Sequence, residues 1–282
     1  MTYHAARAIE ALPHVEAELN YLRPMTEKPR NYTYDPPPGI PRSNATYEAR
    51  RLPIYDVRAL SSEISLDREG FAVIPHRSAV RDFFDDTEVR RTYYCEAERL
   101  IAEWTGASRV FIFDHTQRRR VPGVEDRSPG TPRQPATRIH VDQTVNSGPQ
   151  RVRDFLGDEA DELLRGRVQV INLWHPIRGP LRDAPLALCD AGSVGAGDLV
   201  PSDLVYPDRV GEIYAVTYNP SHRWFYVPEM QPDEALLIKC FDSETDGRAR
   251  FAPHTAFDDP TAPKEVAPRE SIEIRALVFH PA

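Results

Sequence analysis

The sequence predicts a mainly β protein with flanking helices, an α+β fold whose strands form a sandwich or barrel. Proline accounts for 27 of 282 residues, about twice its usual share, which excludes a long helical bundle. From about residue 105 onwards, short apolar runs are separated by Pro, Gly and Asp turns, as in all-β cores. Helical and strand patterns do not alternate as βαβ units require. We therefore expect a β core over residues 105–282 with an N-terminal helical segment packed against it.

Three stretches show helical patterns. Residues 5–22 place Ala, Ile, Leu and Val on one face, and residues 152–166 repeat apolar side chains at helical spacing. The best helix covers 85–105, with Asp85, Asp86 and Thr87 as caps and Gly106 at its end. Strands are expected over 70–75, 109–114, 168–174, 185–189, 213–218, 223–227, 235–241 and 271–279.

The pattern contains neither an internal repeat nor a linker, so we expect one domain, 1–282. Its first part, 1–104, is predicted to be helical or irregular, and its second part, 105–282, holds the strands. The sequence does not indicate an oligomeric state.

Charge and composition restrict the partners. The net charge of -8 argues against nucleic acid. Arg118, Arg119 and Arg120 form the densest basic run, which we interpret as a solvated loop. We expect neither a membrane span nor a signal segment, because no apolar stretch has the required length. Three widely spaced cysteines predict a reducing cytoplasm.

The chain lacks the common phosphate-binding, serine-hydrolase and zinc-protease strings, which leaves its histidines. Two are followed two positions later by a carboxylate. His14 and Glu16 lie in the expected helix, where such positions point in different directions. His140 and Asp142 lie in the extended segment RIHVDQT, where they share one side. Of the two pairs, the second is therefore the metal-site candidate.

A facial-triad iron(II) site needs two imidazoles and one carboxylate on one side of the metal. After His140 and Asp142, we expect a distant histidine as the third ligand, and His254 is the strongest candidate. Arg269 and Ser271 follow it at the start of the final strand. An arginine there can bind a carboxylate bidentately, and the serine hydroxyl adds a third hydrogen bond.

With these residues in place, the sequence resembles the iron(II)/2-oxoglutarate-dependent oxygenases, whose core is a double-stranded β-helix, or jelly roll. Strings over residues 100–280 are similar to the branch that contains gibberellin GA4 desaturases, AsaB-type hydroxylase/desaturases and the cephem 7α-methoxylase component. These strings are INLWHP, DAPLALCD, YAVTYNPSHRWFYVPEM, EALLIKCFDS, ARFAPHTAFDDP and PRESIEIRALVF.

The resemblance implies Fe(II), the cosubstrate 2-oxoglutarate and O2, with a small natural-product intermediate as substrate. It implies that His140, Asp142 and His254 bind the iron and that Arg269, assisted by Ser271, pairs with the distal carboxylate of 2-oxoglutarate. The reaction would couple decarboxylation of 2-oxoglutarate, to succinate and CO2, to hydroxylation or desaturation of the substrate.

One alternative for the carboxylate clamp is Arg275, which shares the strand face of Arg269 and would otherwise contact substrate. Asn172 and Trp174 share one strand face and would line either the cavity or the core. His115 would line the pocket or be a hydrogen-bonded structural residue. The branch usually has Arg at the position of His175, so a pocket-facing His175 would alter substrate recognition.

Two other functions fit a jelly roll with this ligand set. One is a metal-dependent isomerase or hydrolase in which the metal acts as a Lewis acid. The other is a non-catalytic protein that binds a metal or small ligand. Neither needs the oxoglutarate clamp that Arg269 and Ser271 would form, so this pair favours the oxygenase.

Overall fold

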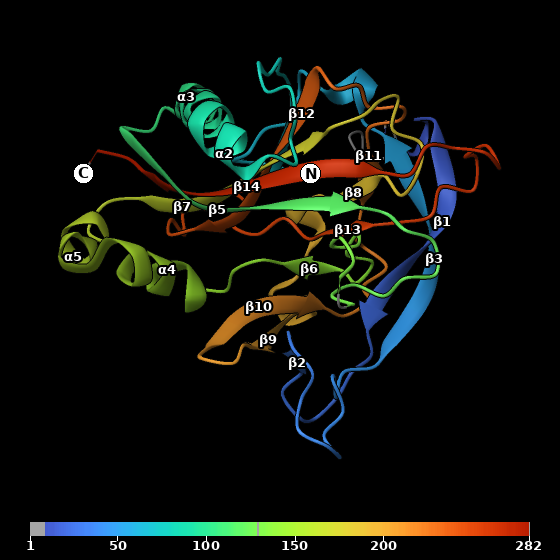
Figure 1. Ribbon diagram of the computed structural model, residues 1–282, viewed down its shortest axis with the longest axis horizontal. Helices are drawn as coiled ribbons and strands as arrows, with labels where there is room; N and C mark the ends of the chain where they lie inside the picture. Colours follow the sequence, from blue (N-terminus) through green and yellow to red (C-terminus); the bar gives the residue numbers. More distant parts are fainter. Residues whose placement is uncertain (1–8, 129, 282) are drawn as a thin grey trace.

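The chain folds into two facing, mostly antiparallel sheets (Figure 1). The structure is a computed structural model that describes residues 9–128 and 130–281. The larger sheet has the order β1 (His14–Leu22), β3 (Tyr47–Asp56), β11 (Trp224–Tyr226), β8 (Leu186–Cys189), β13 (His254–Ala256), β6 (His140–Val141), β10 (Val210–Val216), β9 (Leu199–Val205) and β2 (Arg30–Tyr32). The smaller sheet has the order β4 (Phe71–Pro75), β12 (Glu234–Asp242), β7 (Val168–Pro176), β14 (Glu270–Phe279) and β5 (Arg109–Arg119). This arrangement confirms the predicted β core.

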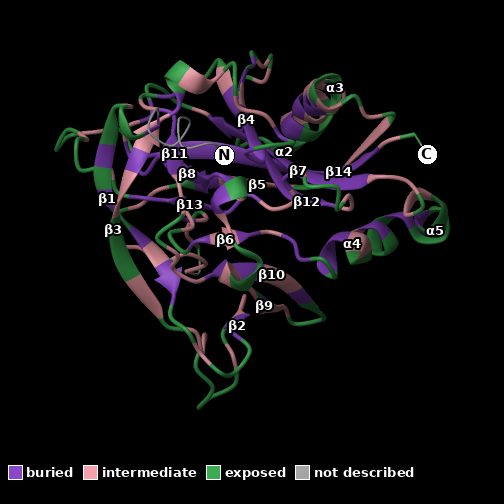
Figure 2. Ribbon diagram, turned by 180° about the vertical axis from the view of Figure 1, so that it is seen from behind, coloured by how far each residue is buried: buried purple, intermediate pink, exposed green. Residues whose placement is uncertain are grey.

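Strand β7 shows how the layers are stacked, because all nine of its residues are buried. Val170 and its neighbours on one face pack between the sheets, whereas Ile171 and Leu173 pack beneath the outer helix. Figure 2 shows the strands of the smaller sheet coloured mostly as buried. A strand covered on both faces is apolar throughout rather than alternating. Side chains on the face between the sheets therefore reach the site, and those on the other face do not.

The helix expected over 85–105 is confirmed, and it covers the smaller sheet (Figure 1). It consists of α2 (Asp86–Glu88), a π-helical turn (Val89–Tyr93) and α3 (Tyr94–Thr105). The side chain of Asp85 accepts hydrogen bonds from the backbone N–H groups of Thr87 and Glu88, as an N-cap does. Gly106 ends the helix with a φ of 68°.

The helix expected over 152–166 begins earlier and is interrupted. It consists of α4 (Ser147–Leu156) and α5 (Ala160–Leu163), with a short 3-10 turn between them. Gly157 adopts a φ of 46° and ends α4.

Replacing Gly148 by alanine is expected to lower the free energy of unfolding by about 1–3 kcal/mol, because it overpacks the core. A Cβ at this position in α4 would lie 2.5 Å from Cγ of the buried Phe241 ring. Urea unfolding measures the change. Gly197→Ala is the matched control, because a Cβ there has no neighbour within 4 Å. Equal stability of the two variants would contradict this packing.

The helix expected over 5–22 is wrong from residue 14 onwards, because residues 14–22 form strand β1, whereas residues 9 and 10 are helical. Polar and apolar residues alternate along HVEAELNYL, which is the strand period, and Pro13 prevents a helix from running through. His14 and Glu16 consequently share one exposed strand face, with 3.8 Å between Nε2 and Oε1. The expectation that His14 and Glu16 point in different directions is therefore wrong. Residues 1–8 lie outside the described part.

The N-terminal region also contributes more strands than expected. β1, β2 and β3 belong to the larger sheet, and β4 pairs with β12 in the smaller one. Strands therefore occur both before and after residue 104, whereas the sequence predicted strands mainly after it. None of the helices within residues 9–128 and 130–281 combines the length and apolar character that a membrane crossing needs.

Candidate active site

Strand pairing brings the predicted metal-ligand residues together. His140 on β6 is the direct partner of His254 on β13, and their ring centroids are 4.5 Å apart. Asp142 follows β6, with its Oδ1 3.5 Å from Nε2 of His140. One ligand atom from each of the three lies within 4.8 Å of the others. In the described part of the chain, no other group of His, Cys, Asp and Glu meets this criterion.

Both imidazoles are oriented by backbone carbonyls. Nδ1 of His140 donates to the carbonyl of Arg138 at 2.8 Å, and Nδ1 of His254 donates to that of Ala252 at 3.1 Å. Because a carbonyl only accepts, each Nδ1 carries a proton, and each Nε2 is the nitrogen left to bind a metal. Burial and the neighbouring His254 lower the pKa of His140 to about 4, so this ring is neutral at pH 7.

The carboxylate of Asp142 is held from behind. Nδ2 of Asn172 donates to its Oδ2 at 2.7 Å, and Nε of Arg275 donates to the same oxygen at 3.1 Å. Burial alone would raise the pKa of Asp142, but Arg275 and the two histidines lower it well below its usual range. Asp142 is therefore ionised, and its Oδ1 remains directed towards His140.

Arg275 is fully engaged by carboxylates. Besides Asp142, it donates to Asp114 at 2.9 Å and to Glu273 at 3.0 Å. An arginine that already contacts three carboxylates is poorly suited to bind a fourth on a ligand. The structure therefore places Arg275 as support for Asp142 and Glu273.

Arg269 has the opposite environment. It is buried, its Nε donates to Oγ of Ser271 at 3.1 Å, and Nη1 donates to the carbonyl of Ala184 at 2.8 Å. The guanidinium lies over the Trp174 ring, 4.9 Å from its centroid. Within the described residues, no carboxylate side chain forms an ion pair with it. Burial and the nearby charge of Arg118 lower the pKa of Arg269 to about 9.

Arg118 is a site residue that the sequence interpretation missed. The predicted solvated loop is wrong at this position, because Arg118 lies on β5 and is buried. Its Nη1 donates to the carbonyl of Gln134 at 2.7 Å, and burial lowers its pKa to about 10. Period-2 alternation in DHTQRR would have found it, since Asp114, Thr116 and Arg118 share one strand face.

The four pocket candidates divide by strand face. Asn172 and Trp174 face the site, where they contact Asp142 and Arg269 respectively. His115 and His175 lie on the opposite, helix-covered face, so a pocket position for them is wrong. His115 bonds to Tyr94 (2.9 Å) and pairs with Asp86; His175 bonds to the carbonyl of Pro232 (2.7 Å) and stacks on Tyr93. The replacement of the branch's usual arginine by His175 therefore affects the packing between β7 and the helix that covers it, and not the pocket.

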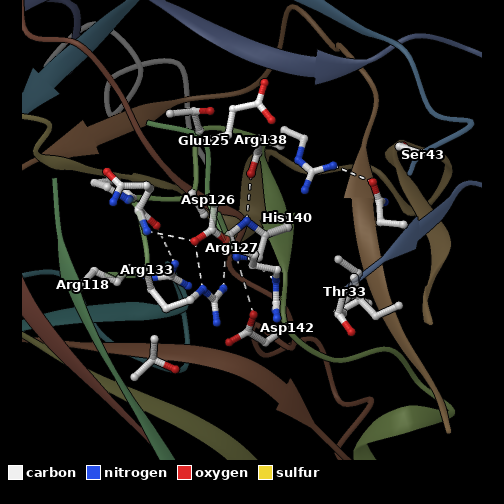
Figure 3. A pocket seen from close by; sticks show the side chains of 18 of the residues that line it. Thr33, Ser43, Arg118, Glu125, Asp126, Arg127, Arg133, Arg138, His140 and Asp142 are labelled. Carbon is white, nitrogen blue, oxygen red and sulfur yellow. Dashed lines mark hydrogen bonds and ion pairs between the residues drawn. The ribbon is translucent and has the colours of Figure 1, made fainter. Parts of the chain in front are cut away.

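A cavity of about 890 Å³ opens beside these residues, and His140, Asp142, Arg275 and Arg118 line it. Figure 3 shows His140 and Asp142 in its wall, with labelled arginines around them. This volume lies within the range of small-molecule sites. Two imidazole nitrogens and one carboxylate oxygen on one side are the donor set of non-haem iron(II) oxygenases. The site can thus hold a metal with open positions that face a cavity.

Comparisons with known proteins agree with this chemistry. A family model described as oxidoreductase/YMDC permease-like domain matches residues 19–279. The hydroxylase/desaturase efuI of Hormonema carpetanum is 34% identical over 95% of each chain. The Fe(II)/2-oxoglutarate-dependent dioxygenase nvfI of Aspergillus novofumigatus is 29% identical over 94% of this chain and 96% of that one.

Among solved structures, the iron and alpha-ketoglutarate-dependent endoperoxidase NvfI superposes with a TM-score of 0.86 at 26% identity, covering 95% of this chain and 99% of that one. Alpha-ketoglutarate is another name for 2-oxoglutarate. The sequence and the fold therefore agree. The chain belongs to this oxidoreductase family, and within it to the Fe(II)/2-oxoglutarate-dependent dioxygenases of hydroxylase/desaturase type, which use Fe(II), 2-oxoglutarate and O2.

Proposed function

We propose that this chain hydroxylates or desaturates a small specialised metabolite and couples that oxidation to decarboxylation of 2-oxoglutarate, with succinate and CO2 as products. The observation that carries the proposal is the convergence of His140, Asp142 and His254 beside a cavity of about 890 Å³. The relatives reported above are named as oxidising enzymes. The isomerase or hydrolase alternative gains no support from them.

The proposed iron ligands are Nε2 of His140, Nε2 of His254 and Oδ1 of Asp142. When bound, the metal supplies the O2 activation and the oxidising power that side chains lack. The contribution of the chain is to fix the ligands. Two backbone carbonyls hold the imidazoles, and Asn172 with Arg275 holds the carboxylate. Such supporting contacts determine ligand orientation and metal affinity.

The proposed clamp for the distal carboxylate of 2-oxoglutarate is Arg269 with Ser271. A buried guanidinium without a carboxylate partner is costly and favours an anionic ligand. Arg118 adds a second buried guanidinium next to Arg269, and it too lacks an ion pair with the described residues. The two positive charges repel each other until an anion binds. We therefore assign both arginines to the cosubstrate end of the cavity, in preference to Arg275.

Replacing Arg118 by glutamine is expected to raise KM for 2-oxoglutarate about tenfold, the effect of losing one charge-assisted hydrogen bond. The melting temperature without 2-oxoglutarate should not fall, because the substitution removes a buried charge that lacks a carboxylate partner. Steady-state kinetics and thermal unfolding measure the two effects. An unchanged KM, or a lower melting temperature that explains the kinetic loss, would contradict the assignment.

We further infer a single-domain enzyme of the cytoplasm whose partner is a small molecule and not a nucleic acid. Strands from the first hundred residues pair into both sheets, which argues against a separate N-terminal domain. Cys95, Cys189 and Cys240 are free thiols, as in reducing compartments. The net charge of -8 disfavours a polyanion.

Cosubstrate turnover tests the proposed reaction without knowledge of the substrate. Protein is loaded with Fe(II) or Zn(II), supplied with carboxyl-labelled 2-oxoglutarate and O2, and assayed for labelled CO2 and succinate. We expect slow, O2-dependent release with Fe(II) and none with Zn(II). Absence of release with Fe(II) bound at the site would overturn the proposal and favour Lewis-acid chemistry.

A further inference from the structure

The cavity is basic although the chain is acidic. Nine arginines line it against six aspartates and glutamates, whereas the whole chain has a net charge of -8. Figure 3 shows Arg127, Arg133 and Arg138 near His140. Several cavity arginines are already neutralised, such as Arg133, whose guanidinium contacts Asp126 at 2.8 and 3.0 Å. Cavity arginines that lack a carboxylate partner keep an uncompensated positive charge.

Two arginines from different parts of the fold, Arg151 and Arg209, lie close to Gly211. A Cβ at Gly211 would lie 3.3 Å from Nη2 of Arg151 on α4 and 3.6 Å from Nη1 of Arg209, which precedes β10. Arg151 pairs through Nη1 with Asp154 at 3.0 Å. Arg209 lies over the Tyr206 ring at 4.1 Å and has no carboxylate within 4.0 Å among the described residues. Of the two guanidiniums, Arg151 has a carboxylate partner and Arg209 has none among the described residues, which leaves the pair with a net charge of +1.

Arg209 is exposed, but the environment of Arg151 is unfavourable without a ligand. The side chain of Arg151 is only 14% exposed, so water screens its charge poorly. Burial and the charge of Arg209 lower its pKa. Gly211 leaves open the space between the two guanidiniums that a side chain would fill. A bound monoanion would relieve the repulsion and accept hydrogen bonds from both arginines.

An apolar wall lies beside the arginine pair. Phe155 follows Arg151 by four residues on α4, so both project from the same helix face. The Phe155 ring stacks on Phe113 of β5 with centroids 5.2 Å apart, and both line the cavity. Phe155 remains 42% exposed, so a ligand skeleton in the cavity can cover its ring and remove apolar surface from water.

We infer that the oxidised substrate is an apolar carboxylic acid whose carboxylate binds between Arg151 and Arg209 and whose skeleton lies on Phe113 and Phe155. This inference rests on the proposed function, because it names the substrate class of the same site. The net charge of +1 matches a carboxylate. A phosphate monoester carries about -1.5 to -2 at pH 7 and would be left partly unpaired.

The test compares a fluorescent acid with its neutral ester. Binding of 1-pyrenebutyrate and of its methyl ester is measured anaerobically by fluorescence anisotropy, on protein loaded with Fe(II) and 2-oxoglutarate. Wild-type protein is expected to bind the acid at least about tenfold more tightly than the ester, as charge-assisted hydrogen bonds provide. Unlabelled dodecanoate should displace the probe, and methyl dodecanoate should not.

Two variants locate the effect. Arg151→Gln with Arg209→Gln, and Gly211→Val, which fills the space but keeps both charges, should each reduce the acid-to-ester ratio to below about twofold. The charge-matched control, Arg77→Gln with Arg90→Gln, changes exposed ion pairs outside the cavity lining and should keep the wild-type ratio.

Equal wild-type affinity for acid and ester, no acid binding, or a preference that survives in both cavity variants would overturn the inference. The metal and cosubstrate spectrum of the wild type is recorded on the same sample. A missing spectrum indicates failure of the proposed function, whereas a normal spectrum without acid preference indicates failure of the substrate class alone.

Discussion

Asp142→Ala is expected to abolish turnover and to weaken iron(II) binding by more than about 100-fold. Loss of a supporting contact alone costs up to about 100-fold in metal affinity, and this change removes a ligand itself. It leaves the two imidazoles without the carboxylate that completes the donor set. Equilibrium dialysis against iron(II) under anaerobic conditions measures the affinity, and succinate release measures turnover.

The matched control is Asp114→Asn. Asp114 also pairs with Arg275, at 2.9 Å, but contributes no atom to the three-residue group. We expect this variant to bind iron nearly as well as wild type. If Asp142→Ala retained both iron and turnover, or if the two variants lost iron equally, the ligand assignment would be wrong.

Arg269→Gln is expected to raise KM for 2-oxoglutarate by about 100-fold or more, because a bidentate, charge-assisted contact in a buried site contributes about 2–5 kcal/mol. The interaction is the same before and during the reaction, so kcat at saturating 2-oxoglutarate should change much less. Kinetics at varied 2-oxoglutarate separate the two effects.

Arg119→Gln provides the comparison for Arg269. Arg119 lies one residue from Arg118 on β5 but is exposed and pairs with Glu270 at 2.6 Å. Glu270 is buried but keeps its second partner, Arg178, at 2.6 Å, so KM for 2-oxoglutarate should stay near its wild-type value. Two results would assign the 2-oxoglutarate carboxylate to Arg275 instead. One is an unchanged KM for 2-oxoglutarate in Arg269→Gln, and the other is a tenfold higher KM in Arg275→Lys without loss of iron.

Local sequence pattern predicted the elements whose period is clear. The helix over 85–105 and the apolar strand at 168–174 follow from spacing and caps, and the structure places both there. The N-terminal strand β1 was missed because its first residues were grouped with a short helical pattern that ends at Pro13. Its own alternation in HVEAELNYL was the stronger signal.

Contacts between residues far apart in the sequence determine features that the local sequence pattern does not reveal. β13 is three residues long, too short to detect from sequence, yet its pairing with β6 places His254 opposite His140. The burial of Arg118 likewise depends on its neighbours in three dimensions, since three consecutive arginines have the composition of a solvated loop. Sequence alone does not show which face of β7 carries His175, whereas in the structure this ring lies on the helix-covered face and stacks on Tyr93.

The choice between Arg269 and Arg275 illustrates the same limit. Strand period predicts that both point to the same face, although Arg269 immediately precedes β14, and sequence spacing favoured Arg269 only through the family resemblance. The ion pairs of the folded chain distinguish them, because the Arg275 guanidinium contacts three carboxylates and the Arg269 guanidinium pairs with none among the described residues.

The most direct test of the metal and cosubstrate site is an anaerobic titration of apoprotein with iron(II) and then 2-oxoglutarate, followed in the visible spectrum. A weak charge-transfer band should appear only when both are present, because 2-oxoglutarate then chelates the metal. Arg269→Gln should need much more 2-oxoglutarate to develop it. A protein that binds iron(II) through His140, Asp142 and His254 but shows no band at any 2-oxoglutarate concentration would contradict the account.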